Sequence, residues 1–221
     1  MDIFFVLLAL HIAGGSVSLL TGLIVLLMKK GGRIHRVFGS IYFYALIIAS
    51  LISLPMAYLH ANLFLFIVGV FTTYMLLSGK SYLNKKSTDD VRPTDWLLSA
   101  LMLIFGLGFV GMGMVNLLKG VVFGVVLLVF GLISISFVVQ DWRNFKGKSQ
   151  IKNYWLTTHL QRMIGSYIAS ATAFLVVNNK FLPGTIAWLL PTVLLTPLIF
   201  KWSKKYLTPK ELKTFPKPKA E

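Results

Sequence analysis

The chain has 221 residues, of which 56% are hydrophobic and only 13% are charged, and its formal net charge is +15. Because a soluble globular domain carries about 25% charged residues, this composition excludes a water-soluble enzyme and indicates a chain that is surrounded by lipid. The sequence contains no cysteine, which excludes disulfides, iron–sulfur clusters, thiolate metal sites and cysteine nucleophiles.

Apolar runs of about 20 residues, long enough to cross the hydrocarbon core of a bilayer as a helix, recur along the chain. We predict seven membrane spans, at residues 3–28, 37–59, 63–79, 96–118, 121–140, 158–176 and 181–200. The seventh contains Pro191 and Pro197, which kink a helix but are tolerated in lipid. The predicted fold class is therefore an all-α, polytopic transmembrane helix bundle. Residues 1–200 form a single transmembrane helical domain, and residues 201–221 form a basic, mobile tail.

The basic residues gather between alternate spans. Of the 22 Lys and Arg residues, all but Lys119 and Lys180 fall on one side of the predicted membrane, if Arg162 at the start of the sixth span is included. The positive-inside rule places this side in the cytoplasm. With seven spans, the N-terminus then lies outside and the C-terminus lies in the cytoplasm. We therefore expect a multi-pass protein of the bacterial cytoplasmic (inner) membrane.

Carboxylates are absent from the predicted spans, since Asp141 falls just past the inner end of the fifth. Ionisable residues at membrane depth are costly and usually functional. Proton- and sodium-coupled transporters usually need a carboxylate there to bind the coupling ion. This predicted absence makes a secondary transporter less favoured.

Each of the four histidines lies in or beside a predicted span: His11, His35, His60 and His159. His35 precedes the second span and His159 opens the sixth, so both lie at the inner boundary. Haem b takes two neutral imidazoles at one depth on facing helices, so this pair provides the candidate ligands for the haem iron. Their neighbours Arg36 and Arg162 could pair with haem propionates or with another anion.

The two outer histidines match a ligand pair less well. His11 lies about 12 Å inside the first span, at 1.5 Å per residue, and is either a ligand or the partner in an interhelical hydrogen bond. His60 is interpreted as an interfacial residue at a helix end. A zinc site is disfavoured, because no carboxylate or thiolate accompanies the histidines.

Small residues follow three histidines on the same helical face. They are Gly15, Ser18 and Gly22 after His11, Gly39 (with Tyr42) after His35, and Ser166 and Ser170 after His159. Small residues let helices pack closely in lipid, and they could equally form a slot for a flat cofactor. For these three spans both interpretations stay open. For the glycines around the fourth and fifth spans, we predict packing alone: Gly106, Gly108, Gly111, Gly113, Gly120, Gly124 and Gly131.

The stretch from His35 to Tyr42, which reads His-Arg-Val-Phe-Gly-Ser-Ile-Tyr, resembles the hallmark of a family of bacterial multi-pass membrane proteins of unknown function. Members show a His in the first span, a His-Arg-x-x-Gly-x-x-Tyr motif that opens the second, and a His that opens a span near the C-terminus. The matching residues are His11, then His35, Arg36, Gly39 and Tyr42, then His159 with Arg162. The resemblance covers roughly residues 5–178 and implies no activity. The histidine layout is more distantly similar to that of the cytochrome b561 type, although the four histidines do not form two matched pairs.

Three functional hypotheses follow from these residues. The first is a haem b-binding electron-transfer protein that uses His35 and His159 and passes electrons between a quinone and a membrane redox partner. The second is a non-redox protein that binds or transports a small anion or a lipid headgroup at the same cluster. The third is a scaffold that docks partner membrane proteins through its glycine faces. The basic tail would contact anionic membrane lipids, and no nucleic-acid binding is expected, because no aromatic platform accompanies the charge.

Overall fold

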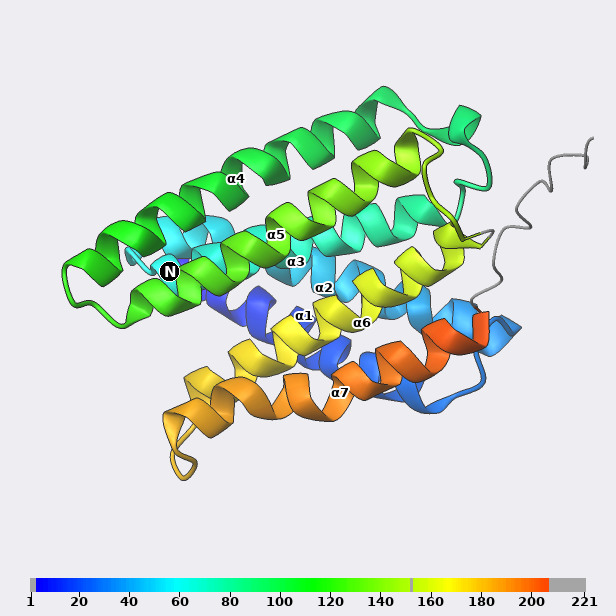
Figure 1. The fold of residues 1–221 in the computed structure, drawn as a ribbon. Coiled ribbons are helices and arrows are strands. Elements are labelled where there is room, and N and C mark those ends of the chain that lie inside the picture. Colours follow the sequence, from blue (N-terminus) through cyan, green and yellow to red (C-terminus); the bar gives the residue numbers. More distant parts are fainter. Residues whose placement is uncertain (1–2, 152, 207–221) are drawn as a thin grey trace, which may run out of the picture.

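The computed structural model describes residues 3–151 and 153–206 of the chain (Figure 1). Within these residues there are seven long α-helices and no β-strand. The helices are α1 (Ile3–Leu27), α2 (Arg33–Leu59), α3 (Leu63–Tyr82), α4 (Pro93–Leu118), α5 (Phe123–Phe145), α6 (Tyr154–Asn178) and α7 (Gly184–Tyr206), and a short 3-10 helix η1 (Thr88–Asp90) precedes α4. Each of the seven is long and apolar enough to cross a membrane. The predicted all-α, multi-pass membrane bundle is therefore confirmed for this part of the chain.

Local sequence explains where the helices begin. Gly31 adopts a φ of +86° in the tight turn between α1 and α2, a conformation that glycine reaches without steric cost. The Asn62 side chain accepts a hydrogen bond from the backbone N–H of Leu65 at 3.0 Å and caps α3. Pro93 occupies the first position of α4, and the carboxylate of Asp95 accepts the backbone N–H of Arg92 at 2.9 Å.

Several helices extend beyond the apolar runs that predict them. Helix α4 begins at Pro93 and α5 continues to Phe145, so Asp95 and Asp141 lie inside spanning helices. The prediction that no carboxylate lies within a span is therefore wrong. Hydropathy ends a span at the first charged residue, whereas a helix continues when that residue finds a partner inside the bundle. Helix α7 likewise includes residues 201–206 of the predicted tail, and residues 207–221 lie outside the described residues.

The helices assemble as two hairpins around a central pair (Figure 1). Helix α4 packs mainly against α5, and α1 packs mainly against α2. Helix α3 joins α2 to α6, and α7 packs on α6. Between α4 and α5 the backbones approach closely, because a Cβ on Gly124 would lie 2.6 Å from the Gly113 carbonyl oxygen and one on Gly131 would lie 2.8 Å from that of Gly106.

These contacts confirm the packing prediction for the four glycines at the hairpin interface. Gly108 and Gly111 behave differently, since a Cβ on either would meet nothing within 4 Å. Gly120 lies in the connection after α4 and has a φ of +74°, so its role is conformational. Because Gly124 packs against the backbone of Gly113 inside the hairpin, it offers no free surface for docking another protein.

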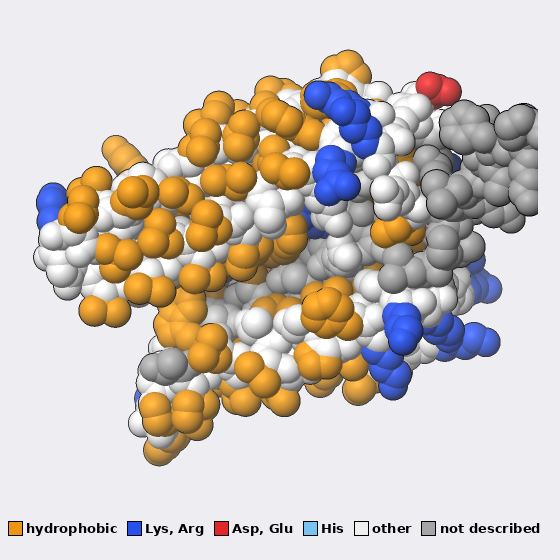
Figure 2. Space-filling view, viewed as in Figure 1, with side chains coloured by type: hydrophobic (Ala, Val, Ile, Leu, Met, Phe, Trp, Pro, Cys, Tyr) orange, Lys and Arg blue, Asp and Glu red, His pale blue; other side chains and the backbone are white. Residues whose placement is uncertain are grey.

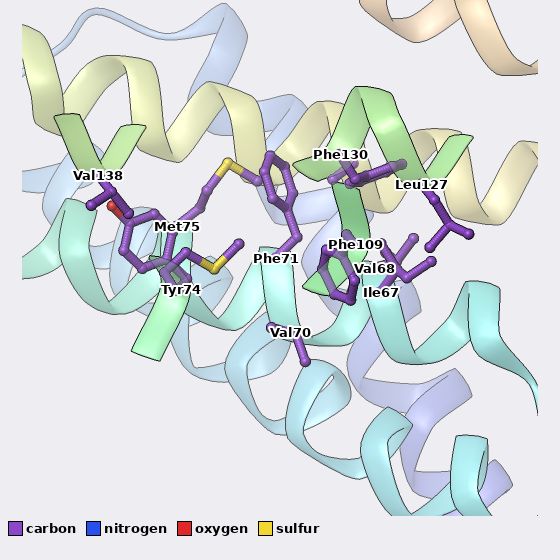
Figure 3. Packing of buried hydrophobic residues seen from close by; sticks show 12 residues of the cluster. Ile67, Val68, Val70, Phe71, Tyr74, Met75, Phe109, Leu127, Phe130 and Val138 are labelled. Atoms are coloured by element: carbon purple, nitrogen blue, oxygen red, sulfur yellow. The ribbon is translucent and has the colours of Figure 1, made fainter. Parts of the chain in front are cut away.

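Aromatic and aliphatic side chains from α3, α4 and α5 form the main core. Figure 3 shows Phe71 of α3 beside Phe130 of α5, with Phe109 of α4 further along the cluster. The Phe71 and Phe130 rings meet edge to face, with 5.1 Å between their centroids. Large apolar side chains also cover the outside, where Ile104 and Leu132 are more than half exposed, as expected of a surface that faces lipid.

The two ends of the bundle differ in charge. The basic end comprises the last turn of α7 and the segments at residues 28–32, 83–92 and 146–151. The opposite end comprises the segments at residues 60–62, 119–122 and 179–183. Figure 2 shows hydrophobic side chains along the flanks of the bundle and Lys and Arg side chains gathered toward one end. That the basic end faces the cytoplasm stays a prediction from the positive-inside rule.

Candidate functional site

A cavity of about 660 Å³ lies at the basic end, among α1, α2, α6, α7 and the end of α3. We call it the basic cavity. Its lining includes two histidines and three cations: His35, His159, Lys30, Arg36 and Lys80. No carboxylate belongs to the described lining, and most of the remaining wall is aliphatic or aromatic. The cavity therefore suits a ligand with an apolar body and a negative charge near the basic end.

His159 enters the basic cavity from the first turns of α6, and its ring is fixed by α3. Its Nδ1 atom lies 2.7 Å from the backbone carbonyl oxygen of Gly79. A carbonyl can only accept a hydrogen bond, so Nδ1 carries the proton and the Nε2 of the neutral ring keeps its lone pair. Metal-bound histidines are held in the same way, by a hydrogen bond from the ring nitrogen that does not bind the metal.

His35 lines the same cavity from the first turn of α2. Its Nδ1 atom is buried and finds no hydrogen-bond partner among the described residues. One turn further, Gly39 opens the wall, because a Cβ there would meet nothing within 4 Å. Tyr42 closes the inner end of this face, and its hydroxyl lies 2.7 Å from the Ser166 Oγ. His35 and His159, which we predict at one depth in the membrane, therefore also line the same cavity.

The three cations of the cavity are held to different degrees. The Lys30 ammonium donates to the carbonyls of Val25 and Leu26 at 2.6 and 2.8 Å and lies 4.0 Å from the Trp202 ring centroid. Burial lowers the pKa of Lys30 to about 8. Lys80 lies over the ring of Phe43, 4.2 Å from its centroid.

Arg36 is the least constrained of these cations. Its side chain is exposed, and in the part of the chain that the structure describes it makes no hydrogen bond, ion pair or ring contact. A guanidinium with all five donors available recognises carboxylates and phosphates in a bidentate manner. Arg36 is thus the cation in this cavity that is best prepared to bind an anion.

Two of the predicted site residues lie away from the basic cavity. The His11 Nδ1 atom lies 2.9 Å from the carbonyl oxygen of Ala49, which is the interhelical hydrogen bond that sequence analysis left open. Arg162 is fully buried and does not line the cavity. Its guanidinium is held by the Asp141 carboxylate at 2.9 Å and by the Phe137 carbonyl at 3.0 Å. The structure therefore brings together His35, Arg36, Gly39, Tyr42 and His159, but not His11 or Arg162.

A second polar cluster, which sequence analysis missed, surrounds this ion pair. We call it the buried polar network, and its members are Tyr74, Tyr82, Asp141, Asn144, Thr158 and Arg162. The Tyr74 and Tyr82 hydroxyls donate to the two oxygens of Asp141 at 2.5 and 2.9 Å. The Asn144 amide donates to the Tyr82 hydroxyl at 3.2 Å and to the Thr158 hydroxyl at 3.4 Å. The sequence signal for this cluster is the series Gln140, Asp141 and Asn144. These polar residues lie three or four positions apart, or side by side, in the last turns of α5.

Comparisons with known proteins provide no family for this chain. No family model matches it, and no curated protein and no solved structure matches it. The resemblance carried by the stretch from His35 to Tyr42 therefore stays a prediction. Among the described residues, no group of three or more His, Asp or Glu side chains could hold a metal ion. A pair of imidazoles is sufficient for haem iron, because the porphyrin supplies the other ligands.

Proposed function

We propose that this multi-pass membrane protein binds haem b in the basic cavity and passes electrons between a quinone and a membrane partner. His35 and His159 would ligate the iron, and bound haem would supply the one-electron chemistry. The observation that carries the proposal is the hydrogen bond from His159 Nδ1 to the Gly79 carbonyl. It leaves Nε2 unprotonated in a cavity that a second histidine also lines.

The remaining lining supports the same ligand. Aliphatic and aromatic side chains would cover the macrocycle, and the open wall at Gly39 leaves space for a flat ring. Arg36, with Lys30 and Lys80, would neutralise the two propionates at the basic end. The volume of about 660 Å³ falls in the range of about 300–1,000 Å³ that is typical of cofactor pockets.

An absorption spectrum tests this proposal directly. Protein purified in mild detergent from haem-replete cells should show a Soret band, and His35→Ala and His159→Ala should lose it. His60→Ala is the matched control, because His60 is exposed at the far end of α2 and does not line the cavity. A correctly folded wild-type preparation without colour, which also fails to take up added haem, would refute haem binding.

A second function, the binding of an anionic lipid headgroup, is favoured by one specific feature. The cavity has three cations and no described carboxylate, and the guanidinium of Arg36 is free to bind a phosphate. Native mass spectrometry should then show an anionic lipid that is retained by the wild type and lost on Arg36→Gln. Arg33→Gln is the control, since Arg33 is exposed nearby and outside the lining. Retention of the lipid by both variants would exclude this function.

A further inference from the structure

A second cavity, of about 440 Å³, lies at the basic end among α5, α6 and α7. We call it the polar cavity. Most of the residues that line it carry an amide or hydroxyl group, among them Gln140, Asn144, Thr157, Thr158, Gln161 and Ser203, although carbon atoms supply most of the lining surface. It shares no lining residue with the basic cavity. The first turns of α6 separate the two, with His159 on one side and Thr157 and Gln161 on the other.

The polar cavity touches the buried polar network. Asn144 and Thr158 belong to both, and the Asn144 amide donates to the Tyr82 hydroxyl at 3.2 Å. Tyr82 in turn donates to Asp141 at 2.9 Å. The ion pair of Asp141 and Arg162 therefore lies two hydrogen bonds from the cavity wall, although both side chains are at most 1% exposed.

Unpartnered polar atoms lie in the wall of the polar cavity and in the network behind it. Tyr154 and Ser203 belong to the cavity lining, both residues are 8% exposed, and the buried hydroxyl of neither has a hydrogen-bond partner among the described residues. In the network, the Nε and Nη1 atoms of Arg162 also lack one. A buried polar group without a partner costs about 1–3 kcal/mol. Ordered water is the usual partner where a polar cavity is large enough to hold it.

Beyond the network, the described core toward the opposite end is mainly apolar, with the buried hydroxyls of Thr72, Ser134 and Thr172 among the apolar side chains. Phe71 lies about one turn from Tyr74 toward that end of α3, and Phe130 of α5 packs against Phe71 (Figure 3). These two phenylalanine side chains are at most 9% exposed and offer no hydroxyl, amide or charge that could continue a chain of water. The hydrogen-bonded connection from Asp141 to a cavity therefore lies at the basic end.

We propose that the polar cavity is a water-filled vestibule that gives water, and the protons it carries, access to the Asp141–Arg162 pair from the basic end. Water in the vestibule contacts Asn144, whose amide donates to the Tyr82 hydroxyl. Proton exchange of the Tyr82 hydroxyl, which donates to Asp141, then takes place with the solution at the basic end. This inference is independent of any ligand in the basic cavity.

The chain offers a clean test, because it contains no cysteine. Thr157 and Thr172 both lie on α6, and they are 4% and 7% exposed. Only Thr157 lines the polar cavity, whereas Thr172 has an unpartnered hydroxyl but lines neither cavity. Thr157→Cys should react with a charged methanethiosulfonate reagent at least about tenfold faster than Thr172→Cys, because thiol modification follows access to water. Intact-mass spectrometry of the full chain in nanodiscs measures the label.

Two further positions keep the test decisive. Ser203→Cys is nearly isosteric and should also react, and Asn144→Cys reports whether the reagent reaches the network itself. In cells and in inverted vesicles, Ser203→Cys should react from the same side as Lys86→Cys in the basic-end segment, and not from the side that labels Lys119→Cys. Rates for Thr157→Cys and Ser203→Cys as low as that of Thr172→Cys would overturn the vestibule, and so would equal labelling of all positions or labelling from the Lys119 side.

Discussion

Removal of one partner of the buried ion pair should be among the most destabilising single changes in this chain. Arg162→Met deletes the hydrogen bonds to Asp141 and to the Phe137 carbonyl and leaves a carboxylate that is 1% exposed without its counter-charge. Breaking a buried pair in this way costs about 3–5 kcal/mol. At about 2–4 °C per kcal/mol for a chain of this size, the unfolding midpoint should fall by about 6–20 °C.

A substitution of Asp141 and a double substitution of the pair distinguish the effect of an unpaired charge on stability from the effect of lost packing. Asp141→Asn leaves the guanidinium of Arg162 buried without an anion, so a loss of similar size is expected. The double variant Asp141→Leu/Arg162→Met removes both charges, and apolar replacement of a whole buried pair is often neutral. It should therefore recover most of the stability that either single variant loses.

Thermal unfolding of the purified protein in one detergent, followed by tryptophan fluorescence, measures these differences. Asp89→Asn is the control, because it removes a carboxylate that is exposed and lies outside the spanning helices. If Arg162→Met shifts the midpoint no more than this control does, the pair is not buried as described. A double variant that is less stable than both single variants would contradict the explanation by uncompensated charge.

Three further predictions concern the helix packing and the basic cavity. Gly131→Ala should lower the free energy of unfolding by about 1–3 kcal/mol, because the new Cβ would lie 2.8 Å from a carbonyl oxygen of α4. Gly108→Ala places its Cβ in open space and should raise the free energy of unfolding by up to about 1 kcal/mol. Thermal unfolding measures both changes. Gly39→Leu should fill the basic cavity and abolish the Soret band or the bound lipid, with little change in the unfolding midpoint. Anion binding should weaken above about pH 8 as Lys30 loses its proton. The stability of the ligand-free protein should rise with pH in the same range, because the unfolded chain binds that proton more tightly. Lys30→Gln should remove both pH effects, and their persistence in this variant would assign them to another group.

Most of the fold could be predicted from sequence because lipid imposes a simple requirement. Each span needs about 20 apolar residues, and the seven runs of this chain correspond one to one to the seven helices in the described residues. The helix ends could not be predicted from hydropathy, because they depend on tertiary partners. The Asp95 carboxylate accepts a hydrogen bond from the Lys85 ammonium at 2.8 Å, and this allows α4 to include Asp95. The Asp141 carboxylate accepts one from the Arg162 guanidinium, and this allows α5 to continue past Asp141.

The candidate site was predictable in part for a similar reason. The parity of the spans places His35 and His159 at the same end, and the structure adds that α2 and α6 line one cavity there. The position of the Arg162 side chain, outside the basic cavity, could not be predicted from its place one turn after His159. It depends on whether an anion lies inside the bundle, and Asp141 became visible as that anion only when α5 was seen to continue past residue 140.

Gly79 of α3 shows why the two sites on α6 are not independent. Its carbonyl accepts the Nδ1 proton of His159 at 2.7 Å, while a Cβ on Gly79 would lie 2.8 Å from the Cβ of Arg162. The same close approach of α3 and α6 therefore orients the histidine of the basic cavity and seats the arginine of the buried polar network. A displacement of α6 that lengthens one contact must alter the other. A change in the basic cavity that shifts α6 together with His159 would therefore also alter the position of Arg162, one helical turn away.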